Sequence, residues 1–151
     1  MFSSLPRLRN SCALIILDSN VISALMNDPP ESKVVAWFDR QPGSSIWTTS
    51  ISILEIQFGL QSMASGKRME SLSQVFEIIL REMDGRVAVF DEDAARTTAT
   101  LMASRQKAGR VGELRDSMIA GIVLARRASL ATRNVAHFAD ISATVVNPWN
   151  A

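Results

Sequence analysis

Short apolar runs alternate with longer stretches of helical pattern along this 151-residue chain. The first run, Ala13–Leu17, is apolar at every position, which is typical of a strand buried on both faces. Further strands are predicted at Ser45–Thr49, Arg86–Phe90, Ser129–Thr132 and Ala143–Val146. Because strands and helices alternate without hairpin turns, we predict an α/β fold, a three-layer sandwich with a parallel sheet between helices.

Helical segments are predicted between these strands. Three of them are Val21–Met26, Ser32–Arg40 and Met69–Met83. A fourth begins at Ser52 and is broken by Ser65 and Gly66, and a fifth begins at Asp91 or Glu92 and ends before Gly109. The last has Asp116 in its first turn and runs to about Arg127. Ser52 and Glu55 have the spacing of a capping box, in which Ser52 would cap its helix.

Polar side chains follow the predicted strands at the same end of each. Asp18 comes directly after the first strand, Glu55 lies beyond the second, Asp116 heads a largely apolar helix, and Asn134 follows the fourth strand. The carboxyl ends of parallel strands meet along one edge of the sheet, where ligands bind. Carboxylates gathered there repel one another, and a hard divalent cation such as Mg²⁺ or Mn²⁺ relieves the repulsion. The sequence therefore predicts a shared metal site.

Each acid taken alone also has a structural explanation. Asp18 suits a turn, Glu55 suits the capping box, and Asp116 is stabilised by the dipole of its own helix. Three such residues on three separate strand–helix junctions favour the shared site over three unrelated roles.

The charge balance limits how the chain can contact nucleic acid. Its 16 basic and 15 acidic residues give a net charge of +1, so such contact requires a local basic surface. Lys107 and Arg110 precede the loop that leads to Asp116, and Arg133 follows the fourth strand. We predict that these three cations contact phosphates. Lys107 and Arg110 are equally well explained as solvated cations at a helix end.

Composition excludes several other site classes. Cys12 is the only cysteine and His137 the only histidine, which rules out an internal disulfide, a cysteine-rich zinc site and a multi-histidine site. No apolar stretch approaches the ~20 residues of a membrane helix. We expect residues 1–12 to be an extension with Cys12 buried near the first strand, and residues 13–149 to form a single domain. Because the extension lacks a cleavage site, we expect a cytoplasmic location.

Four short motifs occur in order within residues 13–149. They are LDSNVI at 17–22, TSISILEIQFG at 49–59, DSMIA at 116–120 and ATRNVAHF at 131–138, followed by VNPW at 146–149. On these motifs the chain resembles the PIN-domain ribonucleases, in particular the VapC-like toxins of bacterial toxin–antitoxin pairs.

The resemblance implies a flavodoxin-like parallel sheet with the acids at its carboxyl edge. It implies that Asp18, Glu55 and Asp116 hold one or two Mg²⁺ or Mn²⁺ ions and carry out the cleavage of RNA. Further implied partners are a cognate antitoxin, encoded as a separate small protein, and a second copy of the chain in a homodimer that pairs again through antitoxin. The side chains expected to hold the carboxylates in place are Ser19, Asn20, Thr132 and Asn134.

One position departs from the family pattern. The family commonly carries a fourth acid where this chain has His137, and Asp140 lies just beyond. A neutral imidazole binds a hard ion less well than a carboxylate does. The departure implies weaker metal binding, or one firmly held ion in place of two.

Other functions remain compatible with the residues. Asp18 could act as the nucleophile of an aspartyl-phosphate phosphotransferase, although Asn20 stands where that class has a second acid. A catalytically weak or inactive PIN-like module could bind RNA or a protein through the acidic pocket. A further open question concerns five apolar residues, which could form core or a surface for a partner. They are Trp37, Phe38, Phe58, Leu60 and Met63.

Overall fold

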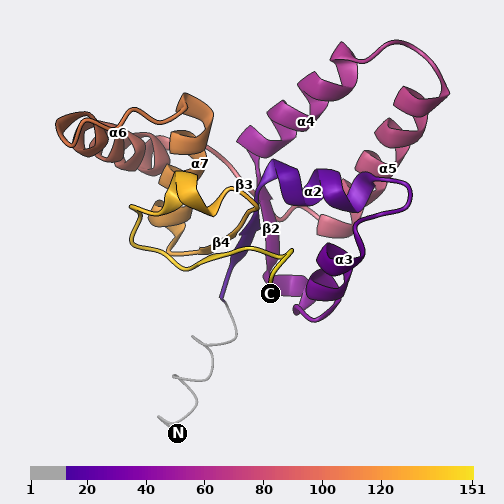
Figure 1. Ribbon diagram of the computed structural model, residues 1–151, viewed down its shortest axis with the longest axis horizontal. Coiled ribbons are helices and arrows are strands. Elements are labelled where there is room, and N and C mark those ends of the chain that lie inside the picture. The colour runs from indigo at the N-terminus through magenta and orange to yellow at the C-terminus, as the bar shows by residue number, and fades with distance from the viewer. Residues whose placement is uncertain (1–12) are drawn as a thin grey trace, which may run out of the picture.

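The computed structural model describes residues 13–151, and within them the chain forms one five-stranded parallel sheet flanked by helices (Figure 1). The strands are β1 (Ile15–Leu17), β2 (Ile46–Thr49), β3 (Val87–Ala88), β4 (Ser129–Ala131) and β5 (Val145–Val146), in the order β3-β2-β1-β4-β5. All four neighbouring pairs are parallel. The predicted α/β class and parallel sheet are confirmed, with each strand shorter than its apolar run.

Helices cover both faces of the sheet (Figure 1). On one side lie α2 (Ser19–Met26), α3 (Ser32–Asp39), α4 (Ser50–Ser62) and α5 (Lys67–Met83); on the other lie α6 (Glu92–Lys107) and α7 (Leu114–Arg126). Successive side chains of β1 pack on opposite faces of the sheet. Leu17 belongs to the core under α2–α5, and Ile16 belongs to the core under α6 and α7. Burial on both faces explains why β1 is apolar throughout.

Strand ends provide the caps of the helices that follow them. Asp18 accepts a hydrogen bond from the Ser19 backbone N–H as α2 begins, and Asp91 caps α6 through the Ala94 N–H. The predicted cap at Ser52 was wrong. The helix begins two residues earlier, at Ser50, so Thr49 is its cap and accepts from the Ser52 N–H at 3.0 Å. The Glu55 side chain is thereby left without a capping role.

The apolar residues whose place was open divide between core and surface. Trp37 and Leu60 are buried, and Phe38 and Met63 pack partly against the same core. Phe58 is 65% exposed. The excess of apolar side chains is therefore mostly core, with Phe58 left on the surface of α4.

Some expectations fall outside this description. Cys12 and the rest of the 1–12 extension lie outside the described residues. Within residues 13–151, no helix is both long and apolar enough to cross a membrane. Two short 3₁₀ turns were not predicted: η1 (Gly43–Ser45), which leads into β2, and η2 (Val135–Phe138), which carries His137.

Gly121 provides a test of the packing between α6 and α7. A Cβ at Gly121 would lie 1.8 Å from Thr98 Oγ1 and 2.9 Å from the Ala94 carbonyl oxygen. We expect Gly121→Ala to lower the free energy of unfolding by about 1–3 kcal/mol, because the two helices would have to move apart. Urea denaturation measures this change.

Gly59 in α4 is the matched control, because a Cβ there meets no atom within 4 Å. Alanine favours a helix over glycine by ~0.8–1.0 kcal/mol, so Gly59→Ala is expected to stabilise the protein. Equal effects of the two substitutions would contradict the close packing described for Gly121.

Candidate functional site

A cavity of about 460 Å³ opens at the carboxyl edge of the sheet. The chain leaves β1 toward one side of the sheet and enters β4 from the other, so the strand order reverses between these two neighbours. In open parallel sheets the ligand crevice lies at such a reversal. The residues lining this cavity include Asp18, Ser19, Asn20, Glu55, Glu113, Asp116, Arg133, Asn134, His137 and Trp149. The three predicted carboxylates therefore come together.

Asp18 is the most buried of the three carboxylates, with 3% of the residue exposed. Its Oδ1 accepts from the Ser19 backbone N–H at 2.8 Å, and its Oδ2 accepts from the Thr132 hydroxyl at 2.8 Å. Burial raises the pKa of Asp18, the hydrogen bonds from Thr132 and Ser19 oppose that rise, and the charge of Asp116 adds to it. Asp18 is held rigidly but is costly to ionise in this form of the protein.

Thr132 links the ends of β1 and β4. While its hydroxyl donates to Asp18, its oxygen accepts from the Asn20 side-chain amide at 3.3 Å and from the Asn134 backbone N–H at 3.1 Å. The Asn20 carbonyl oxygen in turn accepts from the Arg133 backbone N–H at 3.1 Å. One donor and two acceptor positions use the full capacity of a hydroxyl. Asn134 contacts Thr132 through its backbone N–H. Ser19 donates its backbone N–H to Asp18, and its side chain acts on Glu55 by a hydrogen bond that lowers the pKa of that carboxyl.

Glu55 reaches the cavity from the second turn of α4. Its Oε1 is buried without a hydrogen-bond partner, and its Oε2 lies 3.8 Å from Arg115 Nη1. Burial raises the pKa of Glu55, the negative charge of Asp18 raises it further, and Arg115 opposes the rise. A buried carboxylate oxygen without a donor is unfavourable unless a cation or a proton neutralises it.

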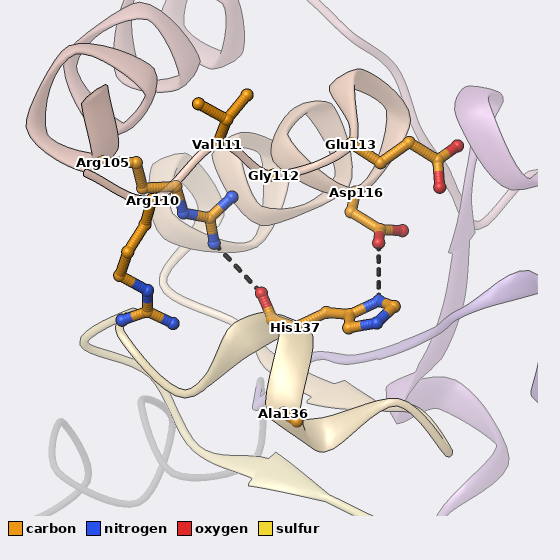
Figure 2. A pocket seen from close by; sticks show the side chains of 8 residues that line it. All are labelled: Arg105, Arg110, Val111, Gly112, Glu113, Asp116, Ala136 and His137. Atoms are coloured by element: carbon orange, nitrogen blue, oxygen red, sulfur yellow. Dashed lines mark hydrogen bonds and ion pairs between the residues drawn. The ribbon is translucent and has the colours of Figure 1, made fainter. Parts of the chain in front are cut away.

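Asp116, in the first turn of α7, faces His137 across the cavity. The imidazole Nδ1 lies 2.8 Å from Asp116 Oδ2 (Figure 2). Because a carboxylate can only accept, Nδ1 must carry the hydrogen in this contact. The side chain of His137 is 55% exposed, so the contact lies at the mouth of the cavity. The position at which the resemblance implied a fourth acid therefore holds a hydrogen-bond donor to Asp116.

Asp140 does not line the cavity. It forms a two-point ion pair with Arg105, with Nε to Oδ2 at 2.8 Å and Nη2 to Oδ1 at 2.9 Å. The hydrogen bonds from Arg105 lower the pKa of Asp140. Arg105 was not predicted from the sequence to lie beside the site. Its position after Ala94, Thr98 and Leu101 at helical spacing on the inner face of α6 was the available signal.

Within residues 13–151, no three histidine, cysteine, aspartate or glutamate side chains already converge closely enough to hold a metal ion. Asp116 is turned to His137, and Glu55 lies nearest to Arg115. The three carboxylates therefore share one cavity without converging on a single point. The donors fit a hard divalent cation by their chemistry, since they are carboxylates and one of their buried oxygens has no partner.

The predicted phosphate-binding cations are placed differently from one another. Arg133 lines the main cavity, with its guanidinium 4.8 Å from the centre of the Trp149 ring. Arg110 lines an adjoining cavity of about 400 Å³, which shares Glu113, Asp116 and His137 with the first (Figure 2). Lys107 is exposed at the end of α6 and lines neither cavity.

Comparison with known proteins agrees with this geometry. The family model described as "PIN domain" matches residues 15–143. The chain is 36% identical over 137 residues to the VapC ribonuclease Y4jK of Sinorhizobium fredii, covering 90% of this chain and 98% of that protein. It is 30% identical over 138 residues to Toxin FitB of Neisseria gonorrhoeae, covering 91% of this chain and 99% of that protein.

A solved structure extends the likeness to three dimensions. The crystal structure of FitAcB from Neisseria gonorrhoeae superposes with a TM-score of 0.84 at 29% identity, covering 91% of this chain and all of that one. Sequence, strand order and the position of the acidic cavity therefore lead to one conclusion. The chain belongs to the PIN-domain family.

Proposed function

We propose that this chain is a metal-dependent endoribonuclease and the toxin of a toxin–antitoxin pair, with residues 13–149 as its single PIN domain. The observation that carries the proposal is the meeting of Asp18, Glu55 and Asp116, from three separate strand–helix junctions, in one cavity. Family membership supports it, as do relatives named VapC ribonuclease and Toxin FitB.

Asp18 and Asp116 would be the principal holders of Mg²⁺ or Mn²⁺, with Glu55 completing the set. The chemistry that such an ion would supply when bound is Lewis-acid polarisation of a phosphoryl oxygen and activation of water for hydrolysis. Asp18 is already oriented by Thr132 and Ser19. His137 contacts only Oδ2 of Asp116, so Oδ1 would be the oxygen that Asp116 offers to the ion, and the partnerless Oε1 of Glu55 offers a further ligand.

The cations would position the RNA. Arg133, which packs over the Trp149 ring, lines the main cavity, and Arg110 lines the adjoining one, so each would meet a phosphate of an RNA strand that enters its cavity. The backbone N–H of Arg133 is held by Asn20, which also contacts Asp18 at 3.4 Å. The amide side chain of Asn20 thus contacts both Arg133, which would bind phosphate, and Asp18, which would bind the metal.

The partner in this proposal is a cognate antitoxin. Leu54 and Phe58, one helical turn apart on α4, are both more than half exposed. Apolar side chains so placed are typical of a surface that another protein covers. The homodimer implied by the family resemblance stays a prediction, which the sedimentation of the purified chain would test.

A second candidate is a PIN-like module that binds RNA or protein but cleaves weakly or not at all. Two observations favour it: the carboxylates of residues 13–151 are not yet converged, and His137 occupies the position of the common fourth acid. The metal-binding and cleavage experiments below distinguish the two candidates.

Neutralising a principal carboxylate tests catalysis. We expect Asp18→Asn and Asp116→Asn each to reduce the cleavage of RNA by more than ~100-fold in Mg²⁺ or Mn²⁺, because even the outer partners of metal ligands contribute ~10–100-fold. Sequencing of the cut ends of defined RNAs measures both rate and target. Asp39→Asn, at an exposed position of α3, is the control. Full activity in either site variant would refute the assignment.

Addition of metal tests the shared site without requiring activity. We expect Mn²⁺ to raise the unfolding temperature, with about 2.7 kcal/mol of stabilisation at 100 times its Kd. Glu55→Gln should weaken this stabilisation, whereas Glu77→Gln, at an exposed position of α5, should not. No stabilisation of the unmodified protein by Mn²⁺ or Mg²⁺ would favour the non-catalytic candidate.

The raised pKa of Glu55 gives a pH dependence for the metal-free protein. A carboxyl whose folded-state pKa lies above its ordinary value, here 4.5, contributes stability at lower pH that is lost as the pH rises through the folded-state pKa. In chelator at pH 7, Glu55→Gln should therefore unfold at a higher temperature than the unmodified protein. The difference should shrink below pH 4.5. A lower unfolding temperature at pH 7 would contradict the unfavourable charge.

The cations differ in expected effect on RNA binding. In chelator, where cleavage is suppressed, Arg133→Gln and Arg110→Gln should each weaken RNA binding and lower the slope of log K against log salt by about 1. Lys107→Gln should change neither, because Lys107 lines neither cavity. Binding measured across a range of salt concentrations would reveal an equal contribution from Lys107, which would contradict this placement.

A further inference from the structure

Arg105 is a buried cation that the proposed chemistry does not use. It lies near the end of α6, with 5% of the residue exposed. Its guanidinium donates to both oxygens of Asp140, to the Ser117 hydroxyl at 3.0 Å and to the His137 carbonyl oxygen at 3.1 Å. One side chain therefore ties α6 to the first turn of α7 and to the η2 turn.

The bonding pattern requires arginine. Only a planar guanidinium presents donors in a fixed fork that can meet two carboxylate oxygens and still reach two further acceptors. Space for it depends on Gly112, where a Cβ would lie 3.0 Å from Arg105 Nη1. A lysine would keep the charge and lose the fork.

The two segments that Arg105 holds carry the two side chains that meet at the cavity mouth. Ser117 is the neighbour of Asp116 in sequence, and the carbonyl bonded to Arg105 belongs to His137 itself. Nδ1 of His137 and Oδ2 of Asp116 lie 2.8 Å apart, next in sequence or in the same residue to the groups that Arg105 holds (Figure 2). The separation between α7 and η2 at this point is thus set by the guanidinium that spans them.

We propose that Arg105, fixed by Asp140, is a positioning residue that sets His137 against Asp116 and so orients the Asp116 carboxylate at the candidate metal site. The inference rests on the proposed function for its catalytic consequence. The claim that Arg105 positions His137 does not depend on the proposed function, because it rests on the hydrogen bonds of Arg105. Arg105 lines the adjoining cavity but not the one that holds the three carboxylates, and it would act on Asp116 through the two segments it joins.

His137 provides a direct readout, because it is the only histidine of the chain. The ¹⁵N and ¹³C signals of a single imidazole are assigned without ambiguity. They report which ring nitrogen carries the hydrogen and whether that nitrogen is hydrogen-bonded. The signals of Asp116→Asn define the state in which the contact with a carboxylate is absent. A tie that is merely structural would lower stability without moving these signals.

The test compares Arg105→Lys with Arg96→Lys on the same helix, whose side chain forms an exposed ion pair with Glu92. At fixed pH and in chelator, we expect the His137 signals of folded Arg105→Lys to move toward those of Asp116→Asn. With metal present, RNA cleavage should fall ~10–100-fold, as for other partners of metal ligands. Arg96→Lys should leave the signals and the cleavage unchanged.

Asp140→Asn serves as the second variant, because it keeps the shape of the side chain and removes one acceptor oxygen. It should move the His137 signals in the same direction, and it replaces Arg105→Lys if that protein does not fold. A folded variant with unmoved His137 signals overturns the inference, and so does one with moved signals but full cleavage. If the unmodified protein fails to cleave RNA, the proposed function fails, while the His137 signals still decide whether Arg105 places that residue.

Discussion

Repulsion among carboxylates at the edge of a parallel sheet is the constraint on which this molecule depends. Asp18 is brought there by β1, the strand at the centre of the core, and cannot withdraw to solvent without disrupting that strand end. The local structure counters its charge with donors from Ser19, Thr132 and Asn20. These bonds only partly offset the effect of burial, since the pKa of Asp18 remains raised. The fold thus keeps a buried carboxylate whose charge is only partly compensated by its neighbours.

The remaining cavity groups show how the chain distributes its compensating charges. Arg115 lies beside Glu55, His137 donates to Asp116, and Arg105 takes Asp140 out of the cavity altogether. Glu55 shares Arg115 with Glu113, whereas Asp116 and Asp140 are paired with His137 and Arg105. Within residues 13–151, the buried side-chain oxygens without a hydrogen-bond partner are Thr48 Oγ1 and Glu55 Oε1, and of these two only the Glu55 oxygen belongs to a carboxylate that lines the cavity.

Much of this arrangement could be predicted from the sequence because its signals are local. The uninterrupted apolar character of Ala13–Leu17 indicates a strand buried on both faces, and an acid directly after it must lie at the sheet edge. Ser52 was predicted to cap α4, but Thr49 does so. Both residue types suit an N-cap, and only the point at which β2 ends decides between them. The Arg105–Asp140 pair joins residues 35 positions apart, and no local pattern indicates such a pairing. The contact of His137 with Asp116 was missed for the same reason.

The two adjoining cavities have a geometric consequence. They share Asp116 and His137 as a common wall, with Arg133 in one and Arg110 in the other. A polymer lying across both would have one cation near its path on each side of Asp116. A polymer bound in this way would not need to have one of its ends at the carboxylates. The layout suits an encounter with the middle of a chain, such as an exposed loop of a folded nucleic acid.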